Sequence, residues 1–149
     1  SEMAAKLVVN DIEKVAGGSE EGVRLVVKAL ISSGVAMSIA GTSRPASGGE
    51  HKFSHWLDSN CDNPALHGEQ CGLGSIVTMY LHGGNWEKIR DTLSTVKAPV
   101  TAKELGIDES LLLSALINSK EIRPQRTTIL DKKTSSQIEE AALATGVIG

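Results

Sequence analysis

Apolar residues recur at the spacing of an α-helix along most of this chain. The first sixteen residues carry one apolar helical face, and after a Gly-Gly break Ser19 is suited to cap a second helix. The large aliphatic side chains of that second helix are expected to face the core. The inward positions predicted in the two helices are Ala4, Leu7, Val8, Ile12 and Val15, then Val23, Val26, Val27, Leu30 and Ile31.

The remaining pattern is also helical. Residues 35–41 predict a further buried helix or the last turn of the second one, and the Gly-, Ser- and Pro-rich residues 42–49 predict a loop. Only residues 127–130 suggest a strand. Further helices are expected within 50–58, 65–82, 85–97, 101–106, 109–122 and 135–146, with Asn85, Thr101 and Asp108 as caps and Glu104 completing a capping box. The pattern therefore predicts one all-α domain over residues 1–149, a bundle of about eight helices.

The segment 65–82 has no polar face beyond its first turn, so it is expected to form a central, buried helix. It nevertheless contains Gly68, Gly72 and Gly74. Each glycine lowers helix propensity by about 1 kcal/mol relative to alanine. Their presence indicates that another backbone or a ligand comes close to this helix.

Composition narrows the class of protein. The 149 residues are 40% apolar but only 3% aromatic, so the core is expected to be aliphatic. A net charge of −3 gives no basic surface for nucleic acid. No unbroken apolar run approaches the roughly 20 residues of a membrane span, and no signal peptide opens the chain. Cys61 and Cys71 are typical of reduced thiols. We therefore expect a cytoplasmic protein without membrane insertion.

Three of the four histidines fall in two short stretches, "EHKFSHW" and "LHGEQCG". His51 and His55 are four residues apart, so on a helix they share a face. That spacing suits two ligands of one metal ion, or one ligand and one substrate contact, and it is equally typical of a solvated face. His67 opens the predicted buried helix, whereas His82 at its other end is expected to be a C-terminal cap.

Two histidines seldom hold a catalytic metal ion alone, because a third protein ligand is expected. The nearest acids in the sequence are Asp58, Asp62 and Glu69. Acids at such positions are also typical of helix surfaces and caps. The spacing of the histidines and nearby acids therefore does not identify the third protein ligand of the metal ion.

The loop "SRPASGGE" offers backbone N–H groups and the charge of Arg44, an arrangement that suits a phosphate group. Such loops are also common without a ligand. No dinucleotide-binding glycine motif and no Walker motif occur in the chain. The loop is therefore a candidate substrate site, with Arg44 as its charged residue.

Several blocks in order resemble the archaeal-type sn-glycerol-1-phosphate dehydrogenases, a family of the metal-dependent alcohol dehydrogenase and dehydroquinate synthase-like superfamily. The blocks are "GVRLVVKALISSGVAMSIAGTSRPASGGEHKFSHWLD", "ALHGEQCGLGSIVTMYLH", "APVTAKELGID" and "KEIRPQRTTIL". Together they cover most of the chain from residue 22 to residue 130.

The resemblance implies reduction of dihydroxyacetone phosphate to sn-glycerol 1-phosphate with NADH or NADPH, for ether lipid synthesis. It implies that His51 and His67 are zinc ligands and that His55 contacts the substrate. Zinc would polarise the ketone. The loop "SRPASGGE", which contains Arg44, favours a phosphorylated substrate.

Members of this family also carry an N-terminal nucleotide-binding α/β domain and a third zinc ligand, an aspartate, ahead of the helical domain. Neither is expected here, so the chain is predicted to be the C-terminal domain, inactive alone and part of a homo-oligomer. Two alternatives stay open. One is a related polyol dehydrogenase acting on glycerol, and the other is a non-catalytic helical interaction domain.

Overall fold

The structure is a computed structural model that describes the backbone of residues 2–149 and the side chains from residue 4 onward. It is all-α, as predicted, and the described residues contain no strand. The predicted strand at 127–130 is wrong, because Thr127 and Thr128 are irregular and Leu130 begins a short 3-10 helix. The helices are α1 (Glu2–Asn10), α2 (Ile12–Ala16), α3 (Glu20–Ala40), α4 (Gly49–Asn60), α5 (His67–Leu81), α6 (Trp86–Thr95), α7 (Ala102–Leu105), α8 (Glu109–Asn118) and α9 (Ser135–Ala144), with the 3-10 helices η1 (Ser119–Glu121) and η2 (Leu130–Lys132).

The helices gather into two compact units, and the prediction of a single domain stays a prediction. Unit 1 comprises residues 1–47 and 94–97, and unit 2 comprises residues 48–93 and 98–149. The main boundary lies at the end of the loop after α3, between residues 47 and 48. Each unit is therefore described by its own helices.

Unit 1 consists of α3 with α1 and α2 packed against it. Ser19 caps α3 as predicted, its Oγ accepting a hydrogen bond from the Gly22 N–H at 3.0 Å. The helix then runs without a break to Ala40, so residues 35–40 extend it rather than form a separate helix. A Cβ at Gly22 would clash with the backbone oxygen of Lys14, because the end of α2 packs directly against this position of α3.

The predicted inward face of α3 is wrong. The buried residues of this helix are the small Gly22 and Ala29, because α1 and α2 cover that side. Most of the predicted inward residues are exposed, and only Val26 is half-buried. The exposed large aliphatic residues of this helix are Val23, Val27, Leu30, Ile31, Val35 and Ile39.

By length and composition alone, α3 could also cross a membrane. Its best 18-residue window has a mean hydropathy of 1.6 and is only 6% buried. The sequence contains no unbroken apolar run of that length, because Arg24 and Lys28 interrupt it. A core helix of a soluble protein or a signal sequence passes the same test, so this single helix is weak evidence for membrane insertion.

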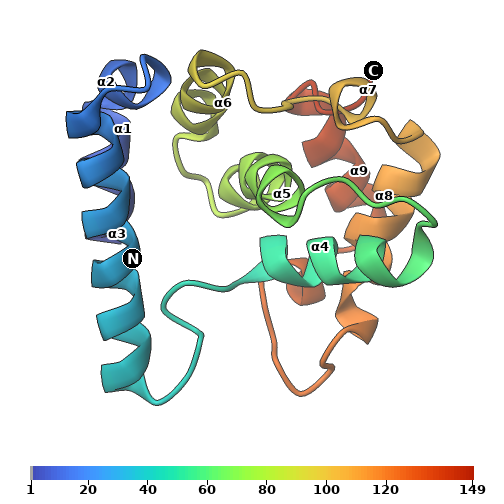
Figure 1. Ribbon diagram of the computed structural model, residues 1–149. Coiled ribbons are helices and arrows are strands. Elements are labelled where there is room, and N and C mark those ends of the chain that lie inside the picture. The colour runs from blue at the N-terminus through green and yellow to red at the C-terminus, as the bar shows by residue number, and fades with distance from the viewer. Residues whose placement is uncertain (1) are drawn as a thin grey trace. The chain divides into compact units, whose positions relative to one another are not determined.

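Unit 2 holds the aliphatic core. Figure 1 shows α4 beside α5, with α8 and α9 at the side of both. Helix α4 packs against α5 and α8, and α9 packs against α5 and α8. Their buried apolar residues form one cluster. It includes Phe53 and Leu57 from α4, Leu73, Ile76 and Val77 from α5, Leu112, Ala115 and Leu116 from α8, and Ile138, Ala141 and Ala142 from α9.

The glycines of α5 explain how α4 approaches it. A Cβ at Gly74 would lie 2.9 Å from Cδ1 of Phe53 and 3.2 Å from the Cα of Glu50, so the backbone of α4 comes close here, as predicted. Gly72 faces the side chain of Leu93 instead. Gly68 has open space around it, so no close approach of protein accounts for that glycine.

The other predicted caps have mixed outcomes. Asn85 Oδ1 accepts from the Lys88 N–H at 2.8 Å, as expected. Thr101 accepts from the Glu104 N–H, but the Glu104 carboxylate accepts from the N–H of Val100 rather than completing the box. Asp108 is the N-cap residue of α8, as predicted, but its side chain makes no capping hydrogen bond.

A buried ion pair ties α4 to the segment around η2. Lys52 Nζ lies 2.8 Å from Asp131 Oδ1 and also donates to the backbone oxygen of Arg126 at 3.2 Å. Burial alone would raise the pKa of Asp131, but the hydrogen bonds from Lys52 and Thr128 outweigh it and lower the pKa. The pair therefore holds the helix that carries two of the candidate site histidines.

Candidate metal centre

Three histidines gather where α4 passes the first turn of α5. The ring centroid of His67 lies 5.2 Å from that of His51 and 5.5 Å from that of His55. His51 and His55 come from one face of α4, as their spacing predicted, and His67 is the first residue of α5. The structure therefore brings together the three histidines that the sequence singled out.

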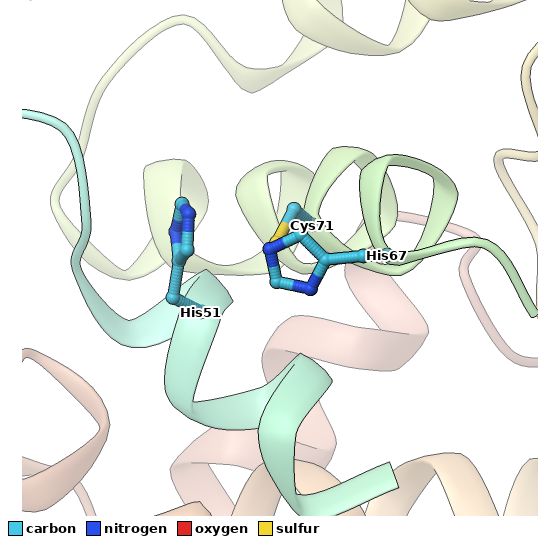
Figure 2. A group of neighbouring side chains, drawn as sticks. All are labelled: His51, His67 and Cys71. Atoms are coloured by element: carbon cyan, nitrogen blue, oxygen red, sulfur yellow. The ribbon is translucent and has the colours of Figure 1, made fainter. Parts of the chain in front are cut away.

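Cys71 belongs to the same cluster. It lies one turn after His67 on α5, and its Sγ is 3.5 Å from Nε2 of His67. Figure 2 shows His51 on α4 and the two α5 side chains next to one another. One ligand atom from each of these three residues lies within 4.8 Å of the others, a spacing that could hold a metal ion.

A chain of hydrogen bonds orients the His67 ring. Gln70 Nε2 donates to the backbone oxygen of Ala65, and Gln70 Oε1 accepts from the Ser54 hydroxyl. Because that hydroxyl has donated its only proton, Ser54 Oγ must accept from Nδ1 of His67, 2.7 Å away. Nε2 of His67 is then unprotonated in the neutral ring, which is the form that ligates a metal.

His51 has a carboxylate partner. Its Nδ1 lies 2.9 Å from Glu50 Oε1, which also accepts from the N–H of Gly48. An imidazole held in this way by an anionic acceptor presents its other nitrogen to a metal. Hydrogen bonds with Cys71 and then with Glu50 raise the pKa of His51 to about 9, so a metal ion must displace a proton there at neutral pH.

The state of Glu50 fits this role. Burial tends to raise the pKa of its carboxyl, but hydrogen bonds with His51 and the Gly48 N–H outweigh that effect and lower it. Glu50 is therefore ionised at neutral pH, and its carboxylate is held by His51 and the Gly48 N–H rather than free at the surface.

His55 has a different environment. Its Nδ1 is 3.8 Å from Asp58 Oδ2, and the two half-exposed side chains form only a loose pair. Burial, and then the positive charge of Arg123, lower the pKa of His55. His55 is therefore neutral at pH 7. A second possible metal group joins His55 and Asp58 to His67.

The donor set of the first group fits a zinc-like ion. Imidazole nitrogen and thiolate sulfur are preferred by zinc and other late transition metals, whereas Mg²⁺ and Ca²⁺ prefer oxygen ligands. The hydrogen bonds to the far ring nitrogens of both histidines are the outer partners that such a site needs.

The other candidate residues have different places. Asp62 and Glu69 enter neither metal group found among the described residues. His82 caps the C-terminus of α5, as expected. Arg44 is an exposed residue of the loop that ends unit 1, so it belongs to the other compact unit.

Sequence reasoning did not predict a site role for Cys71, Ser54 or Gln70, and it interpreted Glu50 as a surface or capping acid rather than as a partner of His51. A signal for Cys71 was present, because His67 and Cys71 share the four-residue spacing that drew attention to His51 and His55. No such signal pointed to Ser54 and Gln70, because their bond links residues on two different helices.

Comparison with known proteins gives a consistent group of relatives, although no family model matches the chain. The chain is 61% identical over 148 residues to a glycerol-1-phosphate dehydrogenase [NAD(P)+] of Pyrococcus horikoshii. It is 57% identical over 148 residues to a protein of the same name from Thermococcus kodakarensis, and 54% identical over 149 residues to one from Methanosarcina barkeri. These matches cover 98–99% of this chain but only 42–43% of each relative. The chain therefore spans less than half the length of these relatives.

Proposed function

This chain belongs to the glycerol-1-phosphate dehydrogenase family, and from that premise we propose that it supplies the zinc and substrate site of an NAD(P)-dependent oxidoreductase. The reaction is reduction of dihydroxyacetone phosphate to sn-glycerol 1-phosphate, the backbone of archaeal-type ether lipids. The names of the relatives support the oxidoreductase class and the glycerol 1-phosphate substrate.

The orientation of the two ligand histidines carries the zinc assignment. Nδ1 of His67 is held by Ser54, and Nδ1 of His51 is held by Glu50, so each ring has its Nε2 left for a ligand. Two imidazoles on an ordinary solvated face would not both need such partners. We therefore assign His51 and His67 as zinc ligands.

When bound, zinc supplies a Lewis acid that polarises a carbonyl group. The neutral imidazole of His55 can donate a hydrogen bond to a substrate oxygen or accept one from it. Its ring stacks on that of His67, with ring planes 30° apart, which supports a role for His55 beside the proposed metal ligands. His55 is thus assigned as the substrate contact that takes part in proton transfer.

Two arginines are candidates for the phosphate group. Arg44, in the glycine-rich loop, is the residue that the sequence favours. Arg123 is supported by a second observation, since its positive charge acts on His55. An anionic substrate held near His55 would be attracted by that charge.

The rest of the proposal concerns the longer protein. Hydride comes from NADH or NADPH bound by an α/β domain outside these 149 residues, and an aspartate from that part is the expected third zinc ligand. The 149-residue chain alone is therefore expected to be inactive. A homo-oligomer in the cytoplasm completes the proposal, and the exposed aliphatic side of α3 is a surface on which subunits or domains could pack.

Zinc titration of the chain, together with activity assays of the longer protein that contains it, tests these roles. His51→Ala and His67→Ala should each lose zinc and turnover. His55→Ala should retain zinc and lose turnover or substrate affinity. If His55→Ala loses zinc as His51→Ala does, His55 is a ligand as well. If His55→Ala loses zinc whereas His51→Ala retains it, the second metal group is the correct one. If His55→Ala keeps full activity, it has no substrate role.

The same assays separate the alternatives. A polyol dehydrogenase would favour glycerol over the phosphorylated substrate in a substrate panel. A helical interaction domain would bind no zinc under any condition. Reduction of dihydroxyacetone phosphate by the 149-residue chain alone would contradict the prediction that it is inactive.

A further inference from the structure

We propose that a buried ion pair, Lys52 with Asp131, positions Arg123 to bind the phosphate group of the substrate. The proposal rests on the proposed function, because it takes the substrate to be a phosphorylated ketone that His55 contacts. It makes Lys52 and Asp131 positioning residues, since neither contacts the substrate. It also selects Arg123, rather than Arg44, as the residue that binds the phosphate.

Arg123 begins a tight turn. Its backbone oxygen accepts a hydrogen bond from the Arg126 N–H at 2.8 Å. The φ angle of Arg123 is +49°, in the left-handed region that residues other than glycine rarely adopt. Such a conformation costs free energy and persists only where the surrounding structure fixes it. The direction of the Arg123 side chain therefore depends on the contacts that hold this turn.

The ion pair supplies those contacts. Lys52 Nζ lies 2.8 Å from Asp131 Oδ1 and donates to the backbone oxygen of Arg126, the last residue of the turn, at 3.2 Å. Oδ2 of Asp131 accepts from both the N–H and the hydroxyl of Thr128, each at 2.7 Å. Because Lys52 is buried, water has little access to these bonds. The pair thus fixes the end of the turn and the segment that follows it.

The same contacts place Arg123 next to the candidate site. Helix η1, which ends two residues before the turn, packs against α4, and Figure 1 shows this segment beside α4. Lys52 precedes His55 by three residues, so the two are neighbours on α4. After burial, which is the larger cause, the positive charge of Arg123 lowers the pKa of His55. All these residues belong to unit 2, whereas Arg44 belongs to unit 1.

The Arg123 side chain has the chemistry that a phosphate group needs. A guanidinium presents its N–H donors in a planar fork that matches two phosphate oxygens. Arg123 is exposed, and within the part of the chain that the structure describes no carboxylate forms an ion pair with it. Its charge is therefore available to attract an anion toward His55.

Steady-state kinetics of the longer protein that contains this chain test the role of Arg123. Arg123→Gln should raise the KM for dihydroxyacetone phosphate about tenfold or more, because a hydrogen bond to a charged group is lost. The KM for NADH and the zinc content should stay unchanged. The inhibition constant of inorganic phosphate, the probe of this site, should rise by a similar factor. Arg123→Lys should recover part of the loss, since it keeps the charge without the planar fork.

Lys120→Gln is the matched control, because Lys120 is an exposed cation of η1 in the same segment. It removes the same charge and should leave both constants unchanged. Equal rises in Lys120→Gln and Arg123→Gln would reveal a general charge effect and overturn the assignment. A raised KM for dihydroxyacetone phosphate with unchanged phosphate inhibition would also overturn it, because Arg123 would then contact another part of the substrate.

A double variant tests the ion pair apart from its effect on stability. Lys52→Met with Asp131→Asn leaves no unpaired buried charge, so the protein should keep nearly the melting temperature of the unmodified protein. Both constants should nevertheless rise toward the values of Arg123→Gln. Adding Arg123→Gln to the double variant should raise them little further, because the three substitutions act through one contact.

A purely structural role of the pair would lower the active fraction of the protein, and with it kcat, but would leave the KM for dihydroxyacetone phosphate unchanged. Unchanged constants in the folded double variant would therefore overturn the positioning role. Fully additive effects of the double variant and Arg123→Gln would overturn it as well.

The results also separate this proposal from the proposed function. If Arg44→Gln raises both constants and Arg123→Gln raises neither, the glycine-rich loop binds the phosphate and only this proposal is overturned. If the unmodified longer protein does not reduce dihydroxyacetone phosphate, or does so without zinc, the proposed function is overturned and this proposal with it.

Discussion

Helices α3 of unit 1 and α5 of unit 2 are both rich in apolar residues, yet they are used in opposite ways. Leu73, Ile76 and Val77 of α5 are 0% exposed, because α4 and α9 cover them. Ile39 of α3 is 84% exposed, and only the small Gly22 and Ala29 of that helix are buried. In unit 1 the packing surface consists of small residues, and in unit 2 it consists of large aliphatic ones.

This difference shows what an apolar helical stripe does and does not indicate. Periodicity identifies the face that avoids water, but the partner that covers this face depends on which other helices are present. In unit 2 the partners lie within the unit. Among the described residues of unit 1, no helix covers the large aliphatic face of α3.

The largest difference in the free energy of unfolding is expected from an isoleucine-to-alanine substitution made once in α5 and once in α3. Ile76→Ala removes side-chain atoms from a fully buried site and should lower the free energy of unfolding by about 2–5 kcal/mol. Ile39→Ala should change it little, because the side chain is already exposed. Urea unfolding of both variants at low protein concentration measures the difference. Equal losses would show that α3 is covered in solution.

Two lysines allow a second contrast. Lys52 in unit 2 is 2% exposed and its partner Asp131 nearly buried, so Lys52→Ala should cost about 3 kcal/mol, the low end for breaking a buried pair. Lys14 in unit 1 is solvent-exposed and forms ion pairs with Glu21 and Asp11. Hydrogen bonds with these two carboxylates raise the pKa of Lys14 to about 12. Lys14→Ala should therefore have a much smaller effect, since solvent screens exposed pairs.

The same pair predicts a pH dependence. Because the pKa of Asp131 is lower in the folded protein, its contribution is fully present above its ordinary value near 3.8 and is lost as the pH falls through the lowered value. Thermal unfolding should show the unmodified chain losing this contribution below about pH 4, whereas Lys52→Ala should lose less there. Parallel losses in both proteins would assign the acid sensitivity to other groups.

The smallest effect concerns association rather than folding. The exposed aliphatic side of α3 should make the isolated chain self-associate as its concentration rises. Ile31→Lys, in the middle of that side, should shift the equilibrium toward monomer, as measured by sedimentation velocity. Leu66→Lys is the control, because Leu66 is an exposed apolar residue of unit 2 that lies away from α3 in the sequence. A strictly monomeric unmodified chain would contradict the prediction.

The candidate site was partly predictable. His51 and His55 lie on one helical face because their four-residue spacing is a local property of α4. The role of Glu50 was not predictable in the same way. Glu50 directly precedes His51, and adjacent residues of a helix do not share a face, so helical spacing gave no indication of the contact between their side chains.

The hydrogen-bond chain through Ser54 and Gln70 was beyond sequence reasoning. Ser54 is a polar residue on the buried face of α4, and Gln70 is a polar residue on the buried face of α5. Each would be unfavourable alone, because a buried polar group without a partner costs about 1–3 kcal/mol. Only the crossing of the two helices pairs them and so selects the His67 tautomer.

The sequence by itself determined the helices and most of their boundaries, since periodicity and capping act between residues within a turn of one another. It also determined which histidines share a face. The tertiary structure decided which apolar faces are buried and that Cys71 lies beside two imidazoles. It also decided that position 74 must be a glycine, because α4 packs against it. The physical reason is the separation in sequence between the residues that interact. A helix needs only its near neighbours, whereas burial and a metal centre depend on residues that the chain brings together from different helices.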